Sequence, residues 1–131
     1  MNIERRFELT DEDSLVLVDI ELYDLPFTLA VDTGATHTVI DLTALLMAGY
    51  ALKDAKGIVQ METAKGILDA YIFEVSEFKA LGITLHNFSV CSYDFLANSV
   101  LASIDGVLGL DFYKGKVLTI DFQKFIIKLT K

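Results

Sequence analysis

The sequence has few of the residues that cross-link or interrupt a chain. Its 131 residues include one cysteine, one proline, no tryptophan and eight glycines. The single cysteine, Cys91, excludes an intrachain disulfide and is typical of a reducing compartment, so we expect a cytoplasmic protein. With so little proline and glycine, a long flexible linker or a low-complexity tract is not expected.

Basic residues and long apolar runs are also scarce. Eleven Lys and Arg stand against 19 Asp and Glu, which gives a formal net charge of −8. An acidic protein repels phosphate, so we expect no nucleic-acid partner. No apolar run is long enough to span a bilayer, and residues 1–13 lack the apolar core of a signal peptide, so we expect no membrane partner.

The hydrophobic fraction of 53% is arranged mostly with the period of β-strands. Short helices are predicted over residues 42–48 and 110–114, and residues 96–104 have no clear pattern. Strands are predicted at 15–22, 27–31, 58–61, 68–75, within 82–93, at 107–109, 116–122 and 125–130, with a turn at 23–26. Many short strands with little helix predict an all-β barrel or sandwich. We expect one domain at residues 15–131, preceded by an N-terminal segment at residues 1–14.

A carboxylate follows directly on the apolar strand at residues 27–31. The segment reads Asp32-Thr33-Gly34-Ala35, which breaks the strand. A buried carboxylate is costly unless it is hydrogen-bonded or paired. Thr33 offers a hydroxyl, and Gly34 lets its backbone N–H approach the acid closely. The pattern therefore predicts a rigid acid at the floor of a site, although Asp-Thr-Gly is also an ordinary turn signature.

Three segments, in this order, resemble the retropepsin-like aspartic peptidases in their single-domain bacterial form. The first is Val31-Asp32-Thr33-Gly34-Ala35-Thr36, with Ile40 shortly after it. The second is the predicted hairpin around Thr63-Ala64-Lys65-Gly66, where the family has its flap. The third is Gly106-Val107-Leu108-Gly109-Leu110-Asp111-Phe112. The resemblance covers residues 15–129.

The resemblance implies a fold and a set of roles. The fold would be a closed β-barrel of the acid protease type with one or two short helices. Asp32 would be the catalytic residue, and Thr33, Gly34 and Ala35 would support it, with Thr33 bonded to the partner's loop. Val107, Leu108 and Gly109 would pack behind the catalytic loop. The hairpin at Thr63, Ala64, Lys65 and Gly66 would close over the substrate.

An aspartic peptidase needs two carboxylates that share one proton. This chain has one Asp-Thr-Gly and no Asp-Ser-Gly. The resemblance therefore implies a homodimer in which the Asp32 pair activates a water and hydrolyses bonds of a peptide or unfolded protein, without a cofactor. We expect terminal segments, near residues 3–9 or 125–129, to help form the dimer interface.

Two departures from the family keep other readings open. Thr36 stands where the retroviral enzymes usually have a second Asp, and the flap has one glycine, Gly66, where theirs are richer in glycine. A dimeric module of the same fold that binds peptides without cutting them is the alternative function. An isolated scaffold domain of a larger polypeptide is a third reading.

A metal site is not expected. The chain offers His37, His86 and Cys91, and the last two are five residues apart on a predicted strand, which places them on opposite faces. Cys91 is interpreted as a small core residue. His37 is interpreted as an ordinary loop histidine in preference to a contact in a substrate subsite.

Overall fold

Strands β2 (Leu17–Leu22) and β3 (Leu25–Val31) form the first hairpin of the chain. The computed structural model describes residues 1–7, 15–63, 66–94 and 104–131, and it joins these strands by a two-residue turn. Tyr23 and Asp24 have φ of 50° and 65°, the left-handed values that so tight a hairpin turn requires. The turn predicted over residues 23–26 was too long, because Pro26 already lies inside β3.

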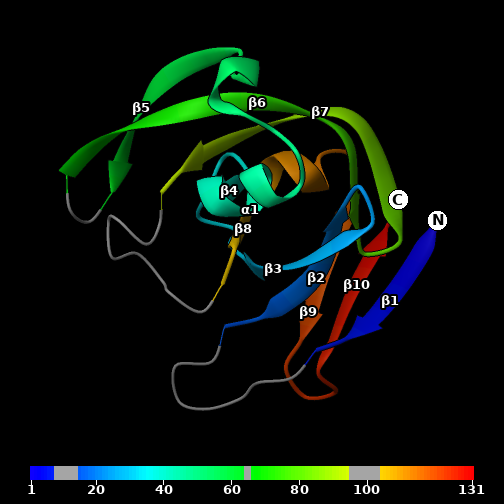
Figure 1. Ribbon diagram of the computed structural model, residues 1–131. Helices are drawn as coiled ribbons and strands as arrows, with labels where there is room; N and C mark the ends of the chain where they lie inside the picture. Colours follow the sequence, from blue (N-terminus) through cyan, green and yellow to red (C-terminus); the bar gives the residue numbers. More distant parts are fainter. Residues whose placement is uncertain (8–14, 64–65, 95–103) are drawn as a thin grey trace.

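Six strands close into a barrel. Around it the order is β2-β3-β8-β4-β7-β6, and β6 pairs back onto β2 (Figure 1). The four strands not yet named are β4 (Val39–Asp41), β6 (Gly66–Ala80), β7 (Ile83–Tyr93) and β8 (Gly106–Leu108). Strand β5 (Gly57–Thr63) adds to the outer edge of β6 and forms a long hairpin with it. The prediction of an all-β closed barrel is confirmed.

The barrel core is aromatic where the longest strand bends. In β6, Phe73 and Val75 are buried, and so are Phe78 and Ala80. The buried positions are thus odd-numbered before Ser76 and even-numbered after it, so the opposite face of the strand is buried beyond this point. A strand that keeps strict alternation cannot do this, so the sheet turns a corner at Ser76. The backbone N–H of Ser76 donates to the hydroxyl of Tyr50 at 3.0 Å, which satisfies a donor at the bend.

A second sheet brings the two ends of the described chain together. Strand β10 (Ile126–Thr130) lies between β1 (Asn2–Arg6) and β9 (Val117–Asp121), all antiparallel (Figure 1). Ile127 and Leu129 of β10 are each 1% exposed and join the barrel core. Part of the predicted N-terminal segment is thus a strand of this sheet, and the domain boundary after residue 14 stays a prediction.

Short helices fill the remaining connections. Helix α1 (Leu42–Met47) follows β4 directly, and the 3-10 helices η1 (Leu52–Asp54) and η2 (Leu110–Tyr113) precede β5 and follow β8. The helices predicted near residues 42–48 and 110–114 are confirmed. No helix within the described ranges has the length and apolarity to cross a membrane. Most of residues 96–104, for which no clear pattern was found, lie outside the described residues.

Candidate active site

The end of β3 holds Asp32 between two neighbouring strands. The N–H of Val31 donates to the carbonyl of Val16 at 2.8 Å, and the N–H of Asp32 donates to the carbonyl of Leu108 in β8 at 3.1 Å. The backbone that carries the acid is therefore hydrogen-bonded on both sides. Asp32 is half-buried and lines a cavity.

The turn after β3 folds back onto the carboxylate. The N–H of Gly34 donates to Oδ1 of Asp32 at 2.9 Å, and the N–H of Ala35 donates to the Asp32 carbonyl at 3.2 Å. A Cβ at position 34 would lie 3.2 Å from Oδ1, so glycine allows the closest approach of backbone to acid. Thr33 is exposed at the tip of the turn.

The segment after β8 holds the turn from behind. Leu110 donates its N–H to the carbonyl of Ala35 at 2.8 Å. A Cβ on Gly109 would meet the carbonyl carbon of His37 at 2.5 Å and the carbonyl oxygen of Ala35 at 2.9 Å. Because both obstacles are backbone, only glycine fits here. Gly109 therefore packs against the backbone of the loop, while Val107 lines the cavity in front of Asp32, and the predicted supporting role of this segment stays a prediction.

A buried polar pair that the sequence did not reveal ties these two segments together. Thr38 is fully buried, and its Oγ1–H donates to a carboxylate oxygen of Asp111 at 2.7 Å while its N–H donates to the same carboxylate at 3.0 Å. The Oγ1 of Thr38 also accepts the N–H of Gly109 at 3.1 Å. Hydrogen bonds to an ionised acceptor are stronger than neutral ones, so Asp111 is the main clamp on the loop.

A cavity of 690 Å³ opens in front of Asp32. One wall is formed by the loop that carries Asp32 together with β4 and β8, and the other lining residues come from β5, β6 and β7. Its apolar lining residues are Ala35, Val39, Val59, Met61, Ile72, Val90 and Val107, and the others are Asp32, Gly34, Thr36, His37, Gln60, Glu62, Ser89, Cys91 and Tyr93. The mixture of an apolar wall and a few polar groups is typical of a site that binds part of a polymer or a small molecule.

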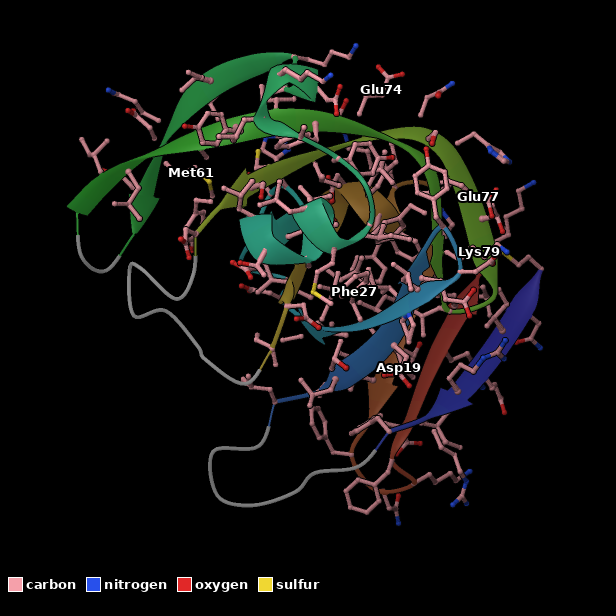
Figure 2. All side chains as sticks on the ribbon, in the orientation of Figure 1. Asp19, Phe27, Met61, Glu74, Glu77 and Lys79 are labelled. Atoms are coloured by element: carbon pink, nitrogen blue, oxygen red, sulfur yellow. The ribbon has the colours of Figure 1, made fainter. Side chains whose placement is uncertain are left out.

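The β5–β6 hairpin covers one side of this cavity. Met61 pairs with Leu68 and Val59 with Ala70, and all four belong to an apolar cluster with Val39 and Cys91. Figure 2 shows Met61 within this hairpin. Of the predicted flap residues, Thr63 pairs with Gly66, which has φ of 115°, while Ala64 and Lys65 lie outside the described residues.

Two further ionisable groups in the cavity are kept neutral. Burial, helped by the charge of Asp111, raises the pKa of the Cys91 thiol, and burial raises the pKa of Tyr93. A thiol with a raised pKa is a poor nucleophile, so Cys91 is not activated for nucleophilic attack. Within the described part of the chain, no group of three or more His, Cys, Asp or Glu side chains is arranged to hold a metal ion.

His37 lies in the loop after Asp32, as its interpretation as a loop histidine predicts. It is exposed and is among the residues that line the cavity, as is Val39, while Thr38 between them is bonded to Asp111. Whether His37 contacts a substrate stays a prediction. His86 is on β7 opposite Glu77, away from the cavity lining.

Comparison with known proteins shows the family and the fold of the chain. A sequence model of the aspartyl protease family matches residues 18–112, which is most of the chain and includes Asp32 and Gly109. A crystal structure of a retropepsin-like aspartic protease from Rickettsia conorii superposes with a TM-score of 0.68 at 17% identity, over 98% of this chain and 91% of that chain. A search of curated protein sequences found no match. The chain belongs to the aspartyl protease family, and its fold is retropepsin-like.

Proposed function

We propose that the chain is an aspartic endopeptidase whose active form is a homodimer, with one Asp32 from each copy. The observation that carries the proposal is the position of Asp32 in the lining of the cavity, where its carboxylate accepts the N–H of Gly34 at 2.9 Å. Among the described residues that line this cavity there is no second Asp. Family membership supports acid chemistry at this residue.

The chemistry requires a second carboxylate beside the first. Two carboxylates in close contact cannot both ionise easily, so one stays protonated while the other remains charged. The charged member removes a proton from water, and the protonated member donates a hydrogen bond to the carbonyl oxygen of the bond to be cut. Because this chain supplies one such acid, a two-fold axis near Asp32 is the simplest way to complete the pair.

Exposed apolar side chains surround the acid where a second copy would approach. Leu110, whose N–H is bonded to the catalytic loop, is 42% exposed, and Leu15, next to the Val16 that pairs with the end of β3, is 40% exposed. Thr33 is exposed at the tip of the same loop. We propose that these side chains lie at the dimer interface, where Thr33 bonds to the partner's loop.

The terminal sheet limits how the ends of the chain take part in the dimer. Strand β10 already uses both of its edges, pairing with β1 on one side and β9 on the other. Of the two segments predicted to form the interface, residues 125–129 therefore have no free backbone edge to offer, whereas β1 lies at an edge of its sheet. Residues 8–9 lie outside the described residues. The ends of the chain would therefore contribute to the dimer interface through β1 or through side chains.

The substrate we propose is an extended segment of a peptide or unfolded protein. The cavity is lined in part by β5 and β7, and its apolar lining residues suit apolar side chains. A single buried cysteine supports the proposal that the dimer works in a reducing compartment such as the cytoplasm.

The proposal is tested with Asp32→Asn, which preserves the size of the side chain and removes the acid. We expect it to abolish hydrolysis of an unfolded protein such as reduced casein, while circular dichroism and light scattering show unchanged fold and dimer. Asp24→Asn is the matched control, because Asp24 is exposed in the β2–β3 turn, where asparagine also accepts positive φ. Normal cleavage by Asp32→Asn would place the chemistry elsewhere.

Light scattering tests the dimer on its own. With a formal charge of −8 on each copy, two chains repel at long range, so association should strengthen as salt is raised from about 0.05 M to about 0.5 M. A strict monomer at every salt and protein concentration would rule out catalysis by paired Asp32. A dimer that binds casein peptides without cutting them would instead support the binding-module function.

A further inference from the structure

Acidic and basic residues lie in different parts of this fold. The terminal segments, residues 1–7 and 114–131, contain the terminal sheet and have seven Lys and Arg against two acids, a formal balance of +5. The other described residues, 15–63, 66–94 and 104–113, have three Lys and no Arg against 13 Asp and Glu, a formal balance of −10. The barrel is therefore strongly acidic, and the terminal sheet beside it is basic.

The cavity in front of Asp32 belongs to the acidic part of the molecule. Its described lining residues include two acids, Asp32 and Glu62, and no Lys or Arg. His37 is counted as neutral at pH 7. Cys91 and Tyr93 are neutral as well, since burial raises the pKa of each. The lining is therefore formally negative.

The three described lysines of the acidic part lie away from this cavity. The Nζ of Lys79 is 3.2 Å from a carboxylate oxygen of Glu77 and 3.6 Å from one of Asp24. Figure 2 shows Lys79 and Glu77 on the side of the molecule opposite the tip of the β5–β6 hairpin. Lys53 and Lys56 line a different cavity, beside the segment that leads into β5. Among the described residues, no Lys or Arg of the cavity lining offsets its two acids.

The basic terminal sheet does not neutralise the cavity either. Figure 1 shows β1 and β10 beside the barrel, on the side opposite the β5–β6 hairpin that covers the cavity. Charges in solution are screened over about 8 Å at physiological ionic strength. The positive charge of the sheet therefore contributes little to the field in front of Asp32.

We propose that the peptidase acts on basic segments of unfolded protein, in which Lys or Arg side chains stand near the apolar residues that fill the cleft. This inference rests on the proposed function. A cleft whose charges have one sign raises the local concentration of ligands of the opposite sign. The apolar part of the lining does not exclude such side chains, because Lys and Arg lay their methylene groups along apolar surfaces and keep the charged end in water.

The test compares three internally quenched peptide libraries that share a mixed core of Ala, Val, Leu, Phe and Ser. The core is flanked on each side by two Lys, two Gln or two Glu residues. In about 0.02 M salt the wild type should cleave the Lys library about tenfold faster in kcat/KM than the Gln library, and the Glu library should be cleaved most slowly. In about 0.5 M salt, where the Debye length is about 4 Å, the ratio of Lys to Gln should fall below about twofold.

Glu62→Gln removes one formal charge from the lining and should lower the ratio of Lys to Gln about twofold in low salt. Glu4→Gln is the matched control, because it makes the same change in the basic terminal sheet, where Glu4 is exposed and paired with Lys128 at 3.2 Å. This control should keep the wild-type ratio. Circular dichroism and light scattering should show the same fold and dimer for both variants. Equal ratios in the two variants would show that the acids of the lining do not set the preference, and would overturn the inference.

Binding to Asp32→Asn, read by fluorescence anisotropy with fluorescein-labelled libraries, separates this inference from the proposed function. Cleavage of the three libraries at equal rates overturns the inference and leaves the peptidase intact. If the wild type cuts nothing while Asp32→Asn binds the Lys library preferentially in low salt, the basic ligand is supported and the peptidase is refuted. A Lys preference that persists unchanged in high salt contradicts a preference set by formal charge.

Discussion

Replacing Asp111 by alanine is expected to loosen the loop that carries Asp32. The carboxylate accepts the Oγ1–H of Thr38 at 2.7 Å and its N–H at 3.0 Å, and Thr38 is 0% exposed. The N–H of this buried residue would lose its acceptor, and an orphaned buried donor costs about 1–3 kcal/mol. The hydroxyl also loses its 2.7 Å bond to the carboxylate, so the total loss should be about 3 kcal/mol.

Asparagine at the same position keeps one acceptor oxygen and the shape of the side chain. Asp111→Asn should therefore cost about 1 kcal/mol, which leaves a difference of about 2 kcal/mol between the two variants. In thermal unfolding this difference corresponds to about 6–10 °C for a chain of this length. Asp111→Asn keeps the size of the side chain, so its comparison with the wild type reports the lost charge, and Asp111→Ala adds the loss of the remaining acceptor and of the packing around it.

Urea unfolding followed by circular dichroism measures these differences at one fixed protein concentration, because dimer formation adds to apparent stability. Thr38→Val completes a double-mutant cycle with Asp111→Ala, and we expect a coupling energy of about 1–2 kcal/mol. Asp69→Ala, an exposed acid on β6, should change stability by less than about 0.5 kcal/mol. Equal stability of Asp111→Ala and Asp111→Asn, or a coupling energy near zero, would refute the clamp.

Three more predictions concern buried positions. Gly109→Ala should lower the free energy of unfolding in urea by at least about 2–3 kcal/mol, because the added Cβ would lie 2.5 Å from a backbone carbon of His37. Gly57→Ala is the control and should be nearly neutral, since the nearest atom to its added Cβ is a side-chain atom at 3.9 Å. Equal losses in the two variants would contradict this packing. Tyr113→Phe should stabilise the fold by about 1 kcal/mol, because the Tyr113 hydroxyl is buried without a partner among the described residues. Burial also raises the pKa of Tyr113, so the folded state holds this proton more tightly than the unfolded state does. The free energy of unfolding of the wild type should therefore fall as the pH rises above about 10. Tyr113→Phe should lessen that fall, and an equal fall in both proteins would contradict the reasoning. The Cys91 thiol, whose pKa is raised by burial, should react slowly with a disulfide reagent in the native protein and fast in urea, and equal rates would show that it is accessible.

Local patterns in the sequence predicted the two hairpins, whose paired strands are neighbours in the chain. The alternation before and after residues 23–24 predicted the first hairpin, and the Gly-containing turn before Gly66 predicted the second. Pro26 misled the first prediction, since proline favours turns but is also tolerated at a strand position that donates no ladder hydrogen bond. Residues 2–6 were left out of the domain because a charged strand at a sheet edge carries little apolar signal.

Contacts between distant parts of the chain could not be predicted in this way. Asp32 stood out because an acid directly after an apolar strand is unusual, and the family resemblance gave it a role. Asp111 and Thr38 are 73 residues apart, and neither is unusual in its own segment, so nothing local pointed to their bond. The same holds for the place of His37 in the cavity lining, since its backbone packs against Gly109 from a distant segment.

Mixing of active and inactive chains tests most directly whether two copies complete one site. Wild type and Asp32→Asn are unfolded together in urea, refolded at varied ratios and assayed for casein cleavage at constant total protein. If each site needs an acid from both chains, activity follows the square of the wild-type fraction, so an equal mixture retains about one quarter of full activity. Activity of about one half, in direct proportion to the wild-type fraction, would show that a single chain carries a complete site and would contradict the account.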